Sequence, residues 1–87
     1  MNKTERIGSK NAGFTILAVA EFNIFGVAFG ERVIDDKVDY VTWIYRASSP
    51  TDYFWGHYIS NFNKAREDFL KRVADEADEN FCNIDLH

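Results

Sequence analysis

The sequence predicts an α+β domain in which a four-stranded antiparallel β-meander carries one C-terminal α-helix packed on one face. Strand-like stretches come first, short polar breaks separate them, and a charged segment with apolar residues at helical spacing follows. The chain has 87 residues, 46% of them hydrophobic and 16% aromatic, which suffices for one small core. We therefore divide it into a flexible N-terminal arm (1–12), a single β-β-β-β-α domain (13–80) and a C-terminal tail (81–87).

The first two strands are expected within the mostly apolar stretch 13–34. Alternation divides the first strand into two sets, of which one holds Phe14, Ile16, Ala18 and Ala20 and the other Thr15, Leu17, Val19 and Glu21. Both sets are fairly apolar, as in a strand that is covered on both faces. After a turn near 21–23, the second strand follows at 24–34, where Gly26 and Gly30 indicate a bulge or a close backbone approach.

The third strand is expected at 38–46 and the fourth at 52–60, on either side of a loop that holds the only proline. Alternation places the third strand's side chains on two faces, Tyr40, Thr42 and Ile44 against Val41, Trp43 and Tyr45. It divides the fourth strand into Tyr53, Trp55, His57 and Ile59 against Phe54, Gly56 and Tyr58. Large aromatic residues therefore occur on both faces of both strands.

A helix is expected from Ser60 or Asn61, either of which can cap its first turn, to about Asn80. Apolar residues recur at helical spacing along one side, at Phe62, Ala65, Phe69, Leu70, Val73 and Ala77. One helix covers only one face of a four-stranded sheet. The aromatic residues of the other face must then be covered by a partner, a second copy or the N-terminal arm.

Charge is distributed unevenly along the chain. The net charge of −4 argues against a general nucleic-acid-binding protein. Acidic residues gather at the end of the predicted helix, at Asp75, Glu76, Asp78 and Glu79. They oppose the helix dipole and so contribute little to stability. Two interpretations stay open, a solubilising terminus or a negative patch that engages Lys and Arg of a nucleic-acid-binding protein.

No combination of residues predicts catalysis, a metal site or a cofactor. His57 has no evident catalytic partner, and its spacing to Cys82 and His87 matches no zinc pattern. We expect a sheet histidine that stacks on Tyr53 or Trp55 or bonds a carboxylate. The acidic neighbours of Cys82 disfavour a reactive thiolate, and a single cysteine forms no internal disulfide.

A membrane segment or signal peptide is not expected. The apolar stretch 13–30 is interrupted by Glu21 and Asn23, which fits neither a spanning helix nor a signal sequence. We therefore expect a cytoplasmic protein.

Three segments, VDYVTWIYR (38–46), DYFWGHYIS (52–60) and NFNKAREDFLKRV (61–73), carry a resemblance. Together they resemble a group of small proteins of bacterial phages and conjugative elements, which show a YVTW strand, a YYWGHY-like strand and a helix with an A..DF..R pattern. The matching residues are Tyr40, Val41, Thr42, Trp43, Tyr53, Trp55, Gly56, His57, Tyr58, Ala65, Asp68, Phe69 and Arg72. The resemblance covers roughly half of the chain. It implies a bacterial host cell and antagonism of host defences such as CRISPR nucleases or restriction enzymes.

We predict a non-enzymatic mobile-element protein that binds and inhibits a host nuclease defence protein, of the anti-CRISPR type. The candidate partner-binding residues are Trp43, Tyr45, Tyr53, Trp55, His57, Tyr58, Asp75, Glu76, Asp78 and Glu79, of which the ring-bearing residues are core residues instead if their face is covered. The alternative is a homodimeric accessory or structural module of a phage or conjugative element. Direct binding of nucleic acid by base stacking is disfavoured because the chain is acidic.

Overall fold

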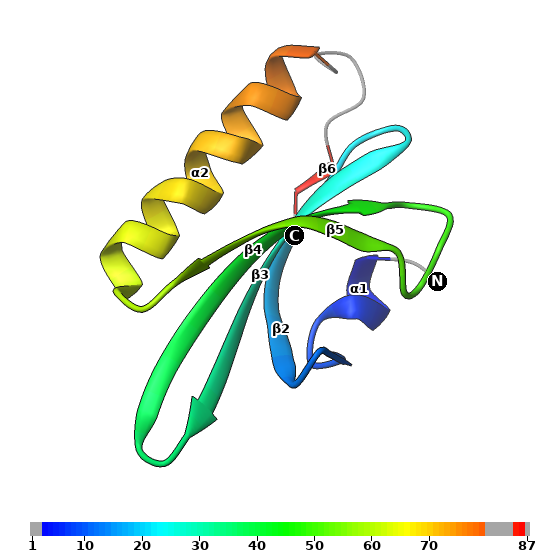
Figure 1. The fold of residues 1–87 in the computed structure, drawn as a ribbon. Coiled ribbons are helices and arrows are strands. Elements are labelled where there is room, and N and C mark those ends of the chain that lie inside the picture. Colours follow the sequence, from blue (N-terminus) through cyan, green and yellow to red (C-terminus); the bar gives the residue numbers. More distant parts are fainter. Residues whose placement is uncertain (1–2, 80–84, 87) are drawn as a thin grey trace.

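A curled antiparallel sheet with one long helix along one face forms the body of the protein, as the computed structural model shows for residues 3–79 and 85–86 (Figure 1). In chain order the elements are α1 (Lys3–Arg6), β1 (Lys10–Asn11), β2 (Phe14–Glu21), β3 (Phe25–Ile34), β4 (Lys37–Arg46), β5 (Tyr53–Ile59), α2 (Phe62–Glu79) and β6 (Asp85–Leu86). The α+β class, the four long strands and the C-terminal helix are as predicted. Asn61 caps α2, since its Oδ1 accepts the Lys64 amide at 3.0 Å.

The predicted number of four strands is wrong, because two very short strands extend the sheet. The strand order is β1-β2-β3-β4-β5, and β6 also pairs with β2. β1 joins the start of β2 and β6 its end, both antiparallel. Each has only two residues, which is too short for any period to show in the sequence. Of the predicted tail 81–87, only residues 85–86 belong to the part that the structure describes.

The segment expected to be a flexible arm is folded against the sheet from residue 3 onward. It contains α1 and β1, and the side chain of Arg6 is fully buried. The Arg6 guanidinium carbon lies 3.9 Å from the centroid of the Tyr45 ring. The guanidinium donates to Tyr53 Oη at 3.1 Å and to the Ser49 carbonyl oxygen at 2.6 Å. Arg6 is charged and lies in a polar segment, so the sequence gives no indication that its side chain is buried. The sequence therefore predicts a flexible arm.

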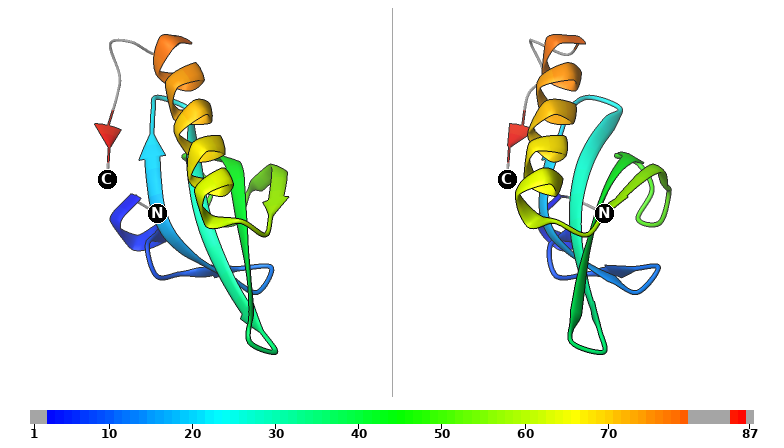
Figure 2. Two further views of the ribbon diagram at one scale, coloured as in Figure 1. Left: turned by 90° about the vertical axis from the view of Figure 1, so that its left-hand side faces the viewer. Right: turned by 60° about the vertical axis from the view of Figure 1, so that its left-hand side comes forward.

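Apolar side chains pack on both faces of the sheet in two clusters. The cluster beneath α2 buries Ala20, Phe22, Val27 and Ile44 and includes partly buried Phe25, Phe54, Phe69, Val73 and Ala77. The cluster on the opposite face contains Phe14, Ile16, Val19, Ala28, Val41, Trp43 and Tyr45. Figure 1 shows α1 and α2 on opposite sides of the sheet, and Figure 2 shows α2 running along its own face. The N-terminal segment therefore helps to cover the face that the single long helix leaves open.

Gly26 allows the ring of Tyr45 to pack directly against the backbone of β3, in the cluster on the face opposite α2. A Cβ atom at this position would overlap the ring of Tyr45. The expected close backbone approach is therefore present, and the alternative of a bulge at Gly26 is not, because the β3–β4 ladder is in continuous register there. The stretch 13–30 forms β2 and part of β3, as predicted. Neither helix in the described part of the chain has the length and apolar character needed to cross a membrane.

A bulge in β2 corrects the predicted faces of that strand. The β2–β3 register shifts between Ile16 and Ala18, which leaves Leu17 as an extra, exposed residue. Beyond the bulge the alternation is inverted, so Val19 joins Phe14 and Ile16 on one face. The predicted set of Phe14, Ile16, Ala18 and Ala20 is therefore wrong from Ala18 onward.

A second bulge corrects the faces of β5. The register with β4 shifts between Thr42 and Ile44, so that two residues, Trp55 and Gly56, face the single Trp43. His57 then lies on the α2 face with Phe54. The other face takes Tyr53, Gly56 and Tyr58, which all approach Trp43. The predicted grouping of Tyr53 with Trp55 and His57 is therefore wrong, whereas the predicted faces of β4 are correct.

Candidate functional site

The bulge in β5 holds Trp55 in a backbone conformation that tryptophan seldom adopts. Its φ is +52°, in the left-handed region. For an L residue other than glycine that region costs roughly 1–2 kcal/mol, and bulges of this kind usually place glycine there. The side chain is nevertheless 74% exposed, so burial offsets little of the strain. A strained backbone that presents an exposed aromatic side chain is typical of a functional position.

Arg72 of α2 fixes the backbone of this bulge. Its Nη2 donates to the Trp55 carbonyl oxygen at 2.7 Å, and its Nη1 donates to the Thr42 carbonyl oxygen at 3.2 Å. The same Nη2 lies 2.7 Å from Nε2 of His57. Burial lowers the pKa of Arg72, and the nearby carboxylates of Asp68 and Glu76 oppose that shift. Arg72 thus joins α2 to β4 and to β5 at Trp55, the residue with the strained backbone.

We call Arg72, His57 and Asp68, which together hold the bulge, the clamp. His57 takes part in it through both ring nitrogens. Its Nδ1 lies 3.0 and 2.9 Å from the two carboxylate oxygens of Asp68. A neutral imidazole that donates from Nδ1 and accepts from Arg72 at Nε2 satisfies both contacts. The expected alternative of a histidine that bonds a carboxylate is therefore confirmed. Both ring nitrogens of His57 are thus engaged in contacts that support the bulge.

Asp68 is the acidic centre of the clamp. Its carboxylate also accepts a hydrogen bond from the buried hydroxyl of Thr42. Burial by itself raises the pKa of Asp68, but the hydrogen bonds from Thr42 and His57 and the charge of Arg72 outweigh burial, so the pKa lies below its usual value. Asp68 therefore stays ionised and holds His57 and Arg72 in place.

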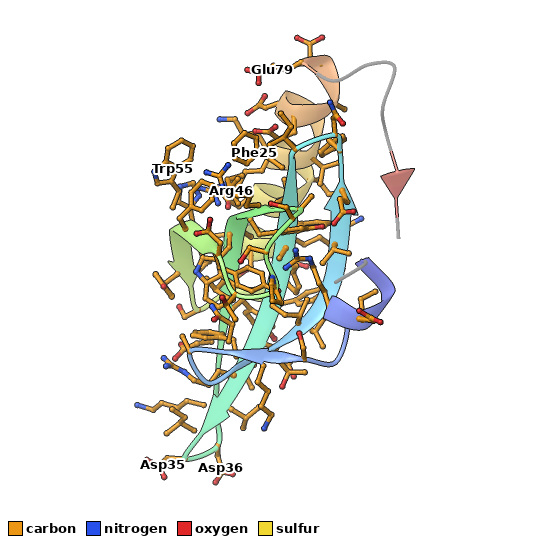
Figure 3. The ribbon with its side chains drawn as sticks, turned by 90° about the vertical axis from the view of Figure 1, so that its right-hand side faces the viewer. Phe25, Asp35, Asp36, Arg46, Trp55 and Glu79 are labelled. Carbon is orange, nitrogen blue, oxygen red and sulfur yellow. The ribbon has the colours of Figure 1, made fainter. Side chains whose placement is uncertain are left out.

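A groove of about 350 Å³ opens beside Trp55, between β3, the bulge and the last turns of α2. Its lining residues are Phe25, Ile44, Phe54, Trp55, Glu76 and Glu79. The ring of Phe54 lies edge-on to Phe25 at 6.1 Å and to Trp55 at 5.1 Å between centroids. Figure 3 shows Trp55 projecting at the edge of the molecule near Phe25, with Glu79 at the end of α2. The groove is aromatic on the sheet side and acidic on the helix side.

The acidic side of the groove lies on the same side of α2 as Arg72. Arg72, Glu76 and Glu79 are spaced four and three residues apart and so share one side of α2. Burial raises the pKa of Glu76, and the nearby carboxylates of Glu79 and Asp75 raise it further, while Arg72 opposes them. A cation that entered the groove would relieve this repulsion.

Arg46 flanks the groove but is engaged with other groups. Its guanidinium carbon lies 5.3 Å from the centroid of the Phe25 ring, and its Nε lies 3.1 Å from the Asp52 carboxylate. Figure 3 shows Arg46 beside Phe25 and Trp55. Within the described residues, the groove lining itself contains neither Lys nor Arg. Aromatic rings beside carboxylates form a surface that suits a positively charged group.

The structure separates the residues that the sequence put forward as one candidate set. Trp55, Glu76 and Glu79 line the groove, His57 supports it, and Asp75 and Asp78 lie exposed on α2 outside its lining. Trp43 is 3% exposed and Tyr45 is fully buried, so both are core residues and present no surface to a partner. Tyr53 and Tyr58 belong to the opposite face, where Tyr58 is 63% exposed.

Sequence reasoning missed Phe25, Phe54 and Arg72 as parts of the site. Asp68 and Arg72 were matched to the A..DF..R pattern, and Trp55 and His57 to the WGH motif, so a signal was present. The contact between the two motifs depends on the bulge, because only the shifted register turns His57 toward α2. Without the bulge, alternation places His57 on the side of Tyr53.

Comparisons with known proteins add no assignment to this site. No family model, no curated protein and no solved structure matches the chain. The resemblance to mobile-element proteins therefore stays a prediction. Across residues 3–79 and 85–86, no three His, Cys, Asp or Glu side chains gather as a metal site would require. Cys82 and His87 lie outside the described residues.

Proposed function

We propose that this protein is a non-enzymatic inhibitor that docks through the Trp55 groove and the acidic end of α2 on a basic surface of a nucleic-acid-binding host protein. The observation that carries the proposal is the strained, exposed Trp55 beside Glu76 and Glu79. The predicted likeness to proteins of phages and conjugative elements favours a nuclease of a defence system, such as a CRISPR or restriction enzyme, as the host protein.

The chemistry of the groove suits this role. Surfaces that bind nucleic acid are rich in Lys and Arg, which contact phosphate groups. Carboxylates on Asp75, Glu76, Asp78 and Glu79 offer the same charge as phosphate and would speed the association with such a surface. An exposed tryptophan beside them supplies the aromatic anchor that often dominates the energy of a protein interface. High salt should therefore weaken the complex.

A phage-plating assay tests the proposal. Bacteria that carry one active CRISPR or restriction system would express the protein, and the survival of a targeted phage would be measured across a panel of such systems. We expect the wild-type chain to restore plating against at least one system and the double variant Glu76→Gln, Glu79→Gln to restore less. Glu67→Gln, on an exposed position of the same helix, is the matched control and should behave as the wild type. Unchanged plating with every system, together with no binding to the purified nucleases, would refute the proposal.

The alternative of a homodimeric accessory module is supported by a different surface. The β3–β4 hairpin projects beyond the body of the sheet, and its end exposes Val33, Ile34 and Val38 (Figure 1). Exposed apolar side chains of this kind favour self-association. Light scattering with size-exclusion chromatography measures the mass of the wild type and of Val33→Glu. A dimer that the substitution dissociates would favour this alternative.

A further inference from the structure

We infer that His57 makes the Trp55 bulge sensitive to pH: its neutral ring holds Arg72 against the bulge, and protonation of Nε2 removes that contact and loosens the strained backbone. The inference rests on the proposed function for one consequence, which is that docking through Trp55 is stronger at neutral pH than in mild acid. Three features of the molecule support it: the hydrogen-bond roles of the ring, its access to solvent and the position of Arg72 on the bulge.

The contacts of His57 determine where the neutral ring carries its proton. A guanidinium has only donors, so Nε2 of His57, 2.7 Å from Nη2 of Arg72, accepts a hydrogen bond. The proton of the neutral ring then lies on Nδ1, which faces the two carboxylate oxygens of Asp68 at 3.0 and 2.9 Å. A histidine that is protonated on both nitrogens has no acceptor left. The contact between His57 and Arg72 therefore exists only while Nε2 is unprotonated.

A second proton on His57 would bring two donors and two positive charges together. The new N–H group at Nε2 and Nη2 of Arg72 would face each other across the same 2.7 Å. Like charges at such a distance repel, and an arginine stays protonated throughout the range in which histidine titrates. The conflict is therefore relieved by separation of the two side chains.

The surroundings of His57 allow it to take up this proton. Among the described residues, the charged groups that contact the ring are Asp68 and Arg72 of α2, and Glu76 acts on Arg72 from one turn further along. Opposite His57 on β4 lies Thr42, which is uncharged. The ionised Asp68 stabilises an imidazolium and opposes the effect of Arg72. The side chain of His57 is 50% exposed, so water can hydrate a protonated Nε2 once Arg72 has moved.

Arg72 transmits the change to the bulge, because one of its nitrogens makes both contacts. Nη2 donates to the Trp55 carbonyl oxygen at 2.7 Å and to Nε2 of His57. When Nη2 moves away from a protonated His57, its bond to Trp55 is weakened as well. A strained conformation such as the φ of +52° at Trp55 persists only where its surroundings enforce it. The loss of one net hydrogen bond shifts the balance between the held and the released bulge by ~2–10-fold.

NMR of the full chain between about pH 5 and pH 8, the range in which histidine normally titrates, tests the inference. At the upper end, the nitrogen chemical shifts of the His57 ring should show a protonated Nδ1 and an unprotonated Nε2. As the pH falls, the backbone amide signals of Trp55 and Gly56 should shift with the same midpoint as the ring of His57. The amide of Val33, near the far end of β3, should show no such step.

Two matched variants assign the titrating group. His57→Gln does not titrate, and its side-chain carbonyl oxygen can still accept a hydrogen bond from Arg72. The pH-dependent step at Trp55 and Gly56 should disappear in this variant. His87→Gln makes the same substitution at the other histidine of the chain and should keep the step.

Four spectroscopic results would each overturn the inference. They are a neutral His57 ring that carries its proton on Nε2, a ring that takes up no second proton above pH ~5, Trp55 and Gly56 signals that do not follow the ring, and a step that persists in His57→Gln. The last result would assign the titration to another group.

Binding to a nuclease that the wild type inhibits tests the consequence for docking. Between pH ~7.5 and pH ~5.5, the affinity of the wild type should fall ~2–10-fold more than that of His57→Gln. An equal pH dependence of the two chains would overturn the inference. If the NMR steps occur but the chain binds no nuclease, only the proposed function fails. If the chain inhibits a nuclease but the NMR steps do not occur, only this inference fails.

Discussion

The surroundings of Arg6 and the groove beside Trp55 contain the same kinds of side chains on opposite faces of one sheet. Around Arg6, the rings of Tyr45 and Tyr53 and the carboxylate of Glu21 enclose a cation that the chain itself provides. Around Trp55, aromatic rings and the carboxylates of Glu76 and Glu79 line a groove at the surface of the molecule. The first arrangement seals the fold, whereas the second presents the exposed indole of Trp55 to solvent. Substitutions in the first should therefore change stability, and substitutions in the second should change binding.

The largest effect is expected for Arg6→Ala. The variant removes the guanidinium that donates to the carbonyl oxygens of Arg46, Ala47 and Ser49. It also removes the cation 3.8 Å from the Glu21 carboxylate, which keeps only the hydrogen bond from the Tyr45 hydroxyl among these contacts. Removing one partner from a buried charged network typically costs ~3–5 kcal/mol of unfolding free energy. Urea denaturation measures the loss, with Arg32→Ala as the control, since the pair of Arg32 with Asp39 is partly exposed. A loss below about 1 kcal/mol for Arg6→Ala would contradict the view that this cation seals the second face.

A smaller loss is expected when the clamp of the groove is removed by Arg72→Ala. The variant loses two charge-assisted hydrogen bonds to carbonyl oxygens and the contact with His57. Hydrogen bonds to charged groups contribute ~1.5–3 kcal/mol, so we expect a destabilisation in that range. The exposed neighbour Lys71→Ala should change stability by less than ~0.5 kcal/mol. The same Arg72 variant should weaken binding to a nuclease that the wild type inhibits, because the bulge is no longer fixed. Unchanged affinity for that nuclease would show that Arg72 does not position Trp55.

Replacing Trp55 by glycine should separate stability from binding. Glycine adopts a positive φ without strain, so Trp55→Gly should leave the unfolding free energy unchanged or raise it by up to ~1 kcal/mol. Binding to a nuclease that the wild type inhibits should weaken, because the exposed indole is gone. Thermal unfolding and a binding titration with the purified nuclease measure the two effects. A destabilisation above about 1 kcal/mol would mean that the exposed ring contributes to the fold after all.

The smallest effects concern pH, where Asp68 and Glu76 should act with opposite sign. The lowered pKa of Asp68 means that its contribution to stability is present above the unfolded value of ~3.9 and is lost as pH falls through the folded pKa. The raised pKa of Glu76 means that its ionised form destabilises the fold once pH rises above the unfolded value of ~4.3.

Urea denaturation between about pH 3 and pH 7 measures this contrast. At neutral pH we expect Asp68→Asn to be less stable than the wild type and Glu76→Gln to be slightly more stable, with both differences shrinking in acid. Differences of the same sign for Asp68→Asn and Glu76→Gln would contradict the assigned environments.

The elements that local pattern determines could be predicted from the sequence. The long strands, the amphipathic helix with its Asn61 cap and the two faces of β4 follow from periodicity and capping. The position of the bulge in β5 does not, because a positive φ is expected at a glycine and occurs here at Trp55. Gly56 is instead required by space, since a Cβ there would lie 2.8 Å from the Tyr58 ring.

The burial of Arg6 and the composition of the groove depend on contacts between distant segments. Arg6 meets Tyr53 across 47 positions of the chain, and Arg72 meets Trp55 across 17. No local pattern encodes such pairs. The sequence did indicate Trp55, Glu76 and Glu79 as candidates, but it grouped them with Trp43 and Tyr45, because period-two alternation cannot tell a covered face from an open one.

The position of the bulge at the margin of the sheet has one more effect. β5 ends the strand order, and in the described chain its outer edge pairs with no other strand. A straight outer strand offers a row of amides and carbonyls on which another chain can add and begin to aggregate. The kink at Trp55 divides this row into short pieces that point in different directions, so an incoming strand finds no continuous template. The distortion that displays the indole thus also protects the protein against uncontrolled polymerisation.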